Sequence, residues 1–203
     1  MEFQEVLRSR RAVRDFKPDP VSPQILRRLA EAAVQAPSSM NEQPWRFSII
    51  TDSSMLLAMS DEAKRHLVKC LPVLPKQEHF RPLFSDPSTH LFHRAPALVV
   101  ISANSENPWA TEDCALAAEN LMLAACDIGL GTCWVGFAQT WLNGREGREM
   151  LGIPISHHVV APIVIGYPRT PSLPAQRRAP DIVWIRKERV AAPAAAAERP
   201  SAA

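Results

Sequence analysis

The sequence predicts a layered domain of the α/β or α+β class, with helices packed on a central sheet. Segments with strand character alternate with segments of helical periodicity. Residues 97–103 begin as a continuous apolar, β-branched run, which is typical of a strand buried on both faces. Gly129, Gly131 and Gly136 lack the GxGxxG spacing and follow a helical segment, and there is no Walker A motif. Rossmann and P-loop enzymes are therefore disfavoured.

The first half of the chain alternates clear start and stop signals. Ser22 followed by Pro23 is typical of a helix start, with a capping hydroxyl and a first-turn proline. Pro37 ends that helix. The expected elements are a first helix over 2–12, a connection over 16–23, the helix from Ser22 to Pro37, a strand over 45–51 and a helix from Ser53 into the mid-60s.

The second half contains the clearest helix, over residues 112–128, with Thr111 as its cap and Gly129 as its stop. Small or apolar residues surround it, so we expect it to be buried, in part against a second subunit. Residues 71–93 show no clean period and predict an irregular excursion or lid. A short helix over 144–151 and a strand over 158–165 follow. One domain spans 1–190, and an Ala/Pro-rich tail over 191–203 is expected to be disordered.

Composition excludes several classes of function. Lys and Arg number 23 against 21 Asp and Glu, a net charge of +2, which gives no general attraction to nucleic acid or membrane. The four cysteines have no zinc spacing, so no metal site is expected. The N-terminus lacks the blocks of a signal peptide, and no apolar run could span a bilayer. A reduced, cytoplasmic protein is expected.

Three clusters carry candidate chemistry. Arg10 and Arg14 would share one helix face if the first helix continued that far, where they could grip a phosphate; a solvated basic helix end is the simpler alternative. Residues 36–45 (APSSMNEQPW) hold hydroxyls and carboxamides between prolines, and could surround a polar ligand or merely stop a helix. The glycine-rich residues 129–136 would let backbone approach a flat ligand, or simply turn into a strand.

Together these motifs resemble the FMN-dependent nitroreductase family. The resemblance rests on Arg10-Arg11-x-x-Arg14, the loop PSSMNEQPW, the segment AAENLMLAACDIGLGTCWVG, and the C-terminal series Gly166-Tyr167-Pro168, Arg177-Arg178-Ala179-Pro180 and Trp184. It spans about residues 3–186 in the family's order. It implies an α+β fold with a central mixed sheet flanked by helices, and an intertwined homodimer with two FMN molecules at its interface.

The resemblance also assigns binding roles. Arg10, with Arg11 beside it, would meet the phosphate, while Arg14 would approach the pyrimidine edge of the flavin. Ala12 stands where some relatives carry a hydroxyl. Arg178, and with it Arg177, would return near the phosphate from the C-terminal region. The loop residues that would come from the other subunit to line the ribityl chain and ring are Pro37, Ser38, Ser39 and Asn41.

Cys133, Trp134, Val135 and Gly136 would lie along the flavin ring, with a backbone N–H near Val135 or Gly136 pointing at N5. Cys133 has no histidine partner at a known spacing, so we interpret it as a packing residue. No protein catalytic dyad is expected, because the flavin carries the chemistry.

The implied activity is a ping-pong reduction of small electron acceptors by NADH or NADPH, with nitroaromatics, quinones and activated alkenes as acceptor classes. Three alternatives remain at this point. The first is a specialised flavoenzyme, such as a reductive dehalogenase or a dehydrogenase of a peptide-derived ring. The second is an FMN-binding protein without turnover, used for storage or sensing. The third, a nucleic-acid or partner-binding module, is weak at a net charge of +2.

Overall fold

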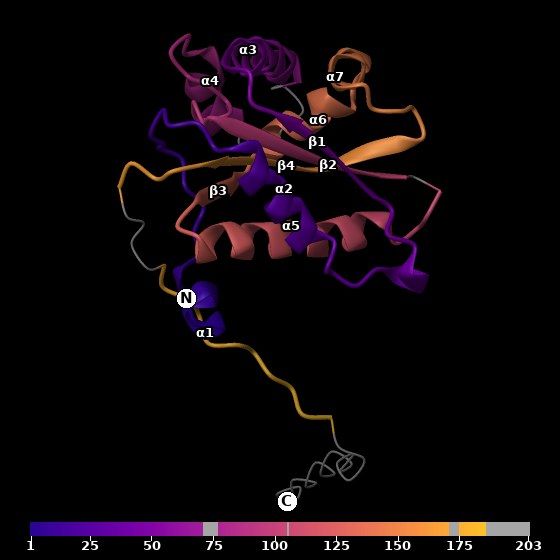
Figure 1. Cartoon of the computed structure of the whole chain (residues 1–203). Coiled ribbons are helices and arrows are strands. Elements are labelled where there is room, and N and C mark those ends of the chain that lie inside the picture. Colours follow the sequence, from indigo (N-terminus) through magenta and orange to yellow (C-terminus); the bar gives the residue numbers. More distant parts are fainter. Residues whose placement is uncertain (71–76, 105, 171–174, 186–203) are drawn as a thin grey trace, which may run out of the picture.

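A four-stranded sheet in the order β1-β2-β4-β3 forms the centre of the computed structural model (Figure 1). The structure describes residues 1–70, 77–104, 106–170 and 175–185. The strands are β1 (Trp45–Ile50), β2 (Ala97–Asn104), β3 (Gly131–Trp134) and β4 (His157–Gly166). All three strand pairings are antiparallel, and within the described residues parallel pairing is confined to a bridge between Ala12 and Thr132.

Helices cover both faces of this sheet (Figure 1). On one side lie α1 (Phe3–Ser9), α2 (Pro23–Ala33) and α5 (Ala110–Asp127). On the other side lie α3 (Ser53–Cys70), α4 (Gln77–Ser85), α6 (Gly136–Asn143) and α7 (Arg145–Leu151). A short 3-10 turn, η1 (Ser39–Asn41), precedes β1. The predicted α+β class is confirmed.

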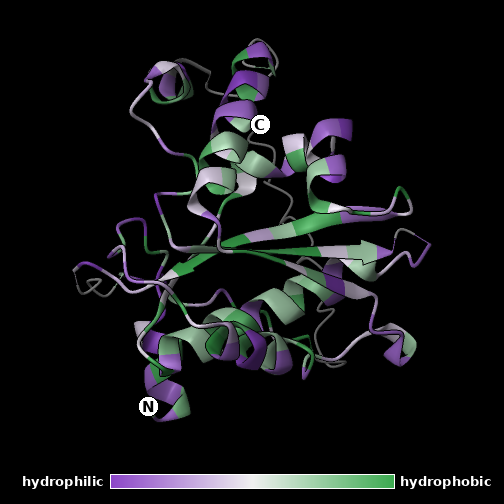
Figure 2. Ribbon diagram, turned by 45° about the horizontal axis from the view of Figure 1, so that its top comes forward, coloured by the Kyte–Doolittle hydropathy of each residue, from purple (hydrophilic) through white to green (hydrophobic). Residues whose placement is uncertain are grey.

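Each face of the sheet has its own apolar core, and Figure 2 shows the hydrophobic strands between helices whose outer faces are hydrophilic. Leu98 and Val100 of β2 point into the core under α3 and α6, whereas Ala97 and Val99 point into the core under α5. Residues 97–103 are buried throughout, as expected for a strand covered on both sides.

The structure confirms one of two helix N-caps predicted from the sequence and contradicts the other. Ser22 caps α2 by accepting a hydrogen bond from the Ile25 N–H at 3.3 Å, as predicted. Thr111 as the cap of the central helix is wrong, because α5 begins at Ala110 and Thr111 lies inside it. The Thr111 hydroxyl instead contacts Nε2 of His158 at 2.9 Å. Gly129 ends α5 with a φ of 79°, as its glycine permits.

The first helix is shorter than predicted. It ends at Ser9, and Arg10 already has extended backbone angles. The chain leaves the helix to run beside β3, where the Val13 N–H donates to the Thr132 carbonyl at 2.8 Å. This pairing buries Val13, and the helix therefore ends before the last turn that the sequence predicted. Arg10 and Arg14 therefore do not share a helix face.

The irregular excursion predicted for residues 71–93 is wrong in part. Residues 71–76 lie outside the described residues, but Gln77–Ser85 forms α4 with Pro82 inside it. Two phenylalanines one turn apart stabilise it: Phe80 and Phe84 each place their ring centroid 5.0 Å from that of Phe137. The tail expected over 191–203 also lies outside the described residues.

Two side chains of α6, Gln139 and Asn143, bond this helix to Val159 of the sheet. The Asn143 amide accepts from the Val159 N–H at 2.8 Å and donates to the Val159 carbonyl at 2.9 Å. These contacts lie where the register between β2 and β4 shifts, next to Ser102. Val159 therefore keeps hydrogen-bond partners beside the irregularity.

Candidate functional site

The candidate site follows β3, an edge strand of the sheet. The segment 12–14 runs alongside it, joined by the Ala12–Thr132 bridge. Gly131 allows this close approach, because a Cβ there would lie 2.7 Å from the Val13 Cβ. Cavities open at both ends of β3, and the strand's four residues separate them by roughly 10 Å.

The first cavity lies where α5 ends and β3 begins, and has a volume of about 200 Å³. Arg10 and Arg11 contribute positive charge to its wall. The Arg10 guanidinium also lies 3.4 Å from a Glu119 carboxylate oxygen of α5. The lining residues are Ser9, Arg10, Arg11, Val13, Cys126, Gly129, Leu130, Gly131, Thr132 and Pro168. A basic wall with a glycine-rich rim suits an anionic group.

The second cavity opens where β3 ends and α6 begins, and its volume is about 580 Å³. It brings Arg14 together with the whole predicted stretch from Cys133 to Gly136. The lining residues are Arg14, Leu83, Thr89, His90, Leu91, His93, Cys133, Trp134, Val135, Gly136 and Phe137. An apolar cavity with a few polar groups is the usual form of a small-molecule site.

Backbone donors differ along this stretch. The Val135 N–H donates to the Pro162 carbonyl at 2.8 Å, so it is already engaged. Gly136 is the first residue of α6, where the N–H has no acceptor within the helix. Of the two predicted donors, Gly136 is thus the one that remains suited to a ligand.

Cys133 is buried and belongs to the core beneath α6. Burial raises the pKa of its thiol, and the neighbouring Arg14 only partly opposes that rise. A thiol in this state is a poor nucleophile. The structure therefore agrees with a packing role for Cys133.

Sequence reasoning missed the histidines of the second cavity. Burial, and then the charges of Arg14 and His90, hold the pKa of His93 below its usual 6.5. His90 also has a lowered pKa, with burial as the main cause. His93 and Arg94 both have positive φ, 54° and 52°, and mark a strained turn. No periodicity in the sequence around them could have indicated this position.

The loop with Pro37, Ser38, Ser39 and Asn41 lies elsewhere. The Ser39 N–H donates to Asp113 near the start of α5 at 3.0 Å. Arg10, in contrast, contacts Glu119, and the N-terminus contacts Asp127 in the last turn of α5. The cavity of Arg10 and Arg11 opens at Cys126, which is about 20 Å from Asp113 along the helix. One protomer therefore does not bring the loop and the arginines together.

Arg177 and Arg178 lie on the exposed, extended segment 175–185. Neither is among the residues that line the two cavities. Trp184, on the same segment, is 77% exposed. This segment leaves the body of the protomer (Figure 1).

An antiparallel sheet between two helical layers is a fold shared with known proteins. The family model described as the nitroreductase family matches residues 7–167. The chain belongs to the nitroreductase family. The fold also matches a crystal structure of a nitroreductase with bound FMN from Bacteroides fragilis, with a TM-score of 0.79, 27% identity, and coverage of 92% of this chain and 100% of that one.

Curated relatives match over shorter stretches. An NADH dehydrogenase of Thermus thermophilus is 41% identical over 54 residues, or 27% of this chain and 26% of the relative. A 4-nitrobenzoate reductase of Pseudomonas putida is 42% identical over 50 residues, or 25% of this chain and 22% of the relative. The matches thus span about a quarter of these relatives' lengths. Within the described residues, no helix is both long and apolar enough to cross a membrane.

Proposed function

We propose that this protein is an FMN-dependent oxidoreductase that uses NADH or NADPH to reduce small electron acceptors by a ping-pong mechanism. The observation that carries the proposal is the pair of cavities at the two ends of β3, joined by the segment 12–14. A basic cavity at one end suits a phosphate, and a larger, apolar cavity at the other suits a flat ring. The family supports the same cofactor.

At the basic end, Arg10 and Arg11 would hold the phosphate. Arg10 is already paired with Glu119, so its guanidinium is oriented before the ligand arrives. A charge-assisted hydrogen bond from such a pre-positioned arginine costs little side-chain entropy. Ala12 supplies no hydroxyl at this point. Contacts of Arg177 and Arg178 with the phosphate stay a prediction.

At the larger end, Arg14 would lie at the pyrimidine edge and Cys133–Gly136 along the ring. Bound FMN would supply the hydride chemistry between nicotinamide and acceptor. A cation near the pyrimidine favours the reduced, negatively charged flavin. The Gly136 N–H would donate to N5, and buried Cys133 would pack beneath the ring. The protein would thus position the flavin, tune its potential and shield it from water, and it would contribute no catalytic dyad of its own.

The loop with residues 37–41 lies away from both cavities of its own subunit, and this favours a homodimer. Leu116 of α5 is 47% exposed, and it continues a stripe of partly exposed residues on the outer face of the helix. The segment 175–185 also exposes apolar side chains, among them Ile182 and Ile185. Exposed apolar surfaces of this kind are typical of interfaces. In the proposed dimer, Pro37, Ser38, Ser39 and Asn41 of one subunit would reach the ring bound by the other.

The acceptor would occupy the space between the ring and α4. Phe137 and Leu83 give this space an apolar wall, and His90 gives it a polar group. Nδ1 of His90 accepts from the Phe92 N–H at 3.2 Å, which leaves the proton on Nε2. A neutral donor beside an apolar wall suits nitroaromatics, quinones and activated alkenes, whose oxygens or π systems accept hydrogen bonds and electrons.

The visible spectrum tests the proposal. Protein as purified should be yellow, bleach under anaerobic NADPH or NADH, and recover its colour when a quinone is added. Yellow protein that no nicotinamide bleaches would support a binding protein in place of an enzyme. Colourless protein that also fails to take up added FMN would refute the proposal.

A further inference from the structure

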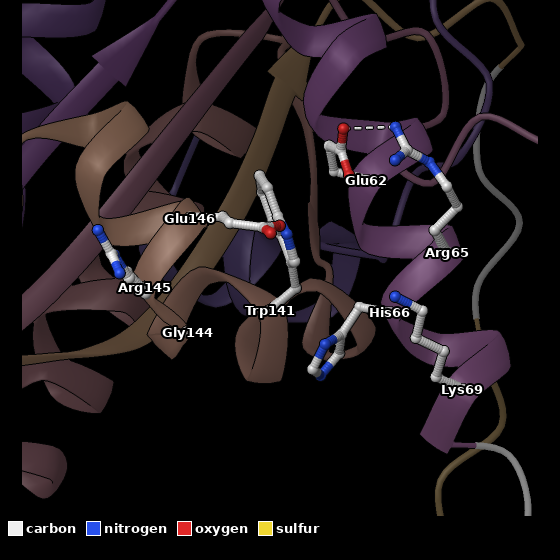
Figure 3. Close-up of a pocket in the computed structure, with 8 residues that line it drawn as sticks. All are labelled: Glu62, Arg65, His66, Lys69, Trp141, Gly144, Arg145 and Glu146. Atoms are coloured by element: carbon white, nitrogen blue, oxygen red, sulfur yellow. Dashed lines mark hydrogen bonds and ion pairs between the residues drawn. The ribbon is translucent and has the colours of Figure 1, made fainter.

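A separate cavity lies on the side of the sheet opposite α5, between α3 and the corner where α6 meets α7 (Figure 3). Its volume is about 370 Å³, within the range of small-molecule sites. The lining residues are Glu62, Arg65, His66, Lys69, Trp141, Gly144, Arg145 and Glu146. It shares none of them with the two cavities along β3. Along α6, Trp141 of this cavity lies one turn, about 6 Å, beyond Phe137 of the ring cavity.

Trp141, which lines this cavity, has an indole N–H without a hydrogen-bond acceptor. Its side chain is almost fully buried, with 2% of the residue exposed, and its indole Nε1 has no hydrogen-bond partner. An indole N–H can only donate, so nothing but an acceptor satisfies it. Leaving such a donor buried and unpaired costs about 1–3 kcal/mol. Nε1 has almost no accessible surface, so an acceptor in the cavity would reach it only once the side chains that cover it move aside.

The charges around Trp141 favour a negatively charged acceptor. Arg65 pairs with Glu62, and the Arg145 guanidinium lies 2.7 Å from Glu149. Lys69 forms no ion pair with any other described residue. With Arg65 and Arg145 so paired, Lys69 is the cation of the lining that remains to face a negatively charged acceptor.

The cavity lining also contains a carboxylate, that of Glu146, that lacks an ion-pair partner among the described residues. Glu146 forms no ion pair within the described part of the chain, and Figure 3 shows it beside Trp141, facing α3 across the cavity. The wall thus offers donors from Trp141 and Lys69 and an acceptor from Glu146. A ligand with both an anionic group and a donor group would satisfy both.

We propose that this cavity binds a small amino acid or hydroxy acid. Its carboxylate would accept from the Trp141 indole N–H and from the Lys69 ammonium, while its amine or hydroxyl would donate to Glu146. The site would be distinct from the flavin site, because different residues line it.

The test is NMR of full-length protein labelled with ¹⁵N at its tryptophan indoles, titrated with glycine and with lactate. The Trp141 indole signal, assigned by its loss in Trp141→Phe, should shift saturably. Lys69→Met should weaken binding by about tenfold or more, since it removes a hydrogen bond between charged groups. Arg28→Ala removes an exposed cation on α2, across the sheet, and should leave the titration unchanged. An unchanged flavin content in each variant reports that the fold is intact.

Three results would overturn the proposal. The first is an indole signal that no carboxylate shifts but that Glu146→Gln moves, because Glu146 would then be the internal acceptor. The second is a shift with inorganic phosphate alone, because the site would then prefer another anion. The third is equal weakening by Lys69→Met and Arg28→Ala, because binding would then follow net charge and not this cavity.

Discussion

Small side chains fill the core between the sheet and α5, among them Ala97, Ala117 and Ala125, whereas large ones fill the core on the other side, among them Phe92 and Trp141. Small residues let α5 lie close against the strands, and the basic cavity of this side opens at the C-terminal end of the helix. Large, irregular side chains beneath α3, α4, α6 and α7 leave gaps between them. The cavity beside α4 and the cavity of Trp141 both lie on that side. Close packing thus supports the proposed dimer face, and looser packing makes room for ligands.

The largest expected effect comes from Gly131→Val, at the junction of the two layers. Any Cβ there would lie within 3 Å of the Val13 side chain, so segment 12–14 must leave β3. We expect a loss of about 1–3 kcal/mol of unfolding free energy, measured by urea denaturation, and loss of bound flavin. Gly136→Ala is the control for the stability measurement alone, since a Cβ at Gly136 meets no protein atom within 4 Å but Gly136 lines the ring cavity. Equal stability of both variants would contradict the role given to the close approach.

The next effect tests the outer face of α5. Leu116→Arg places a charge on the exposed stripe and should weaken the dimer by about 30-fold or more, giving monomers in light scattering at micromolar concentration. Ile155→Arg serves as the control, because Ile155 is 94% exposed and lies near the other layer, between α7 and β4. A Leu116→Arg protein that stays dimeric and keeps its flavin would place the interface elsewhere.

A smaller effect is expected from Arg14→Ala in the ring cavity. Loss of one charge-assisted contact should raise the FMN dissociation constant by about tenfold and lower the flavin potential. Equilibrium dialysis and a redox titration measure the two quantities. Arg8→Ala, which removes an exposed charge of α1, should change neither. Unchanged retention and potential in Arg14→Ala would refute its role.

The smallest effect is a pH dependence on the looser side. His90 and His93, which line the ring cavity on that side, have pKa values lowered from 6.5 mainly by burial. The unfolded chain then binds more protons just below that pH, so the free energy of unfolding should fall as pH decreases from 6.5. Urea denaturation at pH 7.5 and 5.5 measures it. His93→Asn keeps a residue that tolerates positive φ and should reduce the dependence; an unchanged slope would exclude His93 as a source.

The sequence predicted the elements whose signals are local. Ser22-Pro23 and the apolar run of β2 are examples, because capping chemistry and strand burial are determined by neighbours in the chain. The sequence did not predict the elements whose ends or formation depend on contacts between residues far apart in the chain. The helix before Arg10 stops because β3 offers a partner to Val13, and α4 forms despite Pro82 because Phe137 packs on it.

The candidate site divides in the same way. Arg14 and Cys133–Gly136 meet in one cavity, as the motifs indicated, although their ligand remains a proposal. His90, His93 and the cavity of Trp141 had no sequence signal, because a backbone turn and the meeting of three helices create them. Pro37–Asn41 lines neither of the two cavities along β3, which no pattern in a single chain can show.

The Asn143 side chain makes the two hydrogen bonds to Val159 that a peptide unit of a neighbouring strand would make. Donor and acceptor on one amide match the C=O and N–H of Val159, and neither a carboxylate nor a hydrocarbon of the same size offers both. Substitution by aspartate would set a carboxylate oxygen against the Val159 carbonyl, and substitution by leucine would leave the Val159 N–H unpaired and its carbonyl with the Gln139 amide alone. A position that lines none of the proposed ligand cavities is therefore as chemically restricted as a binding residue, and this restriction holds the end of α6 in place.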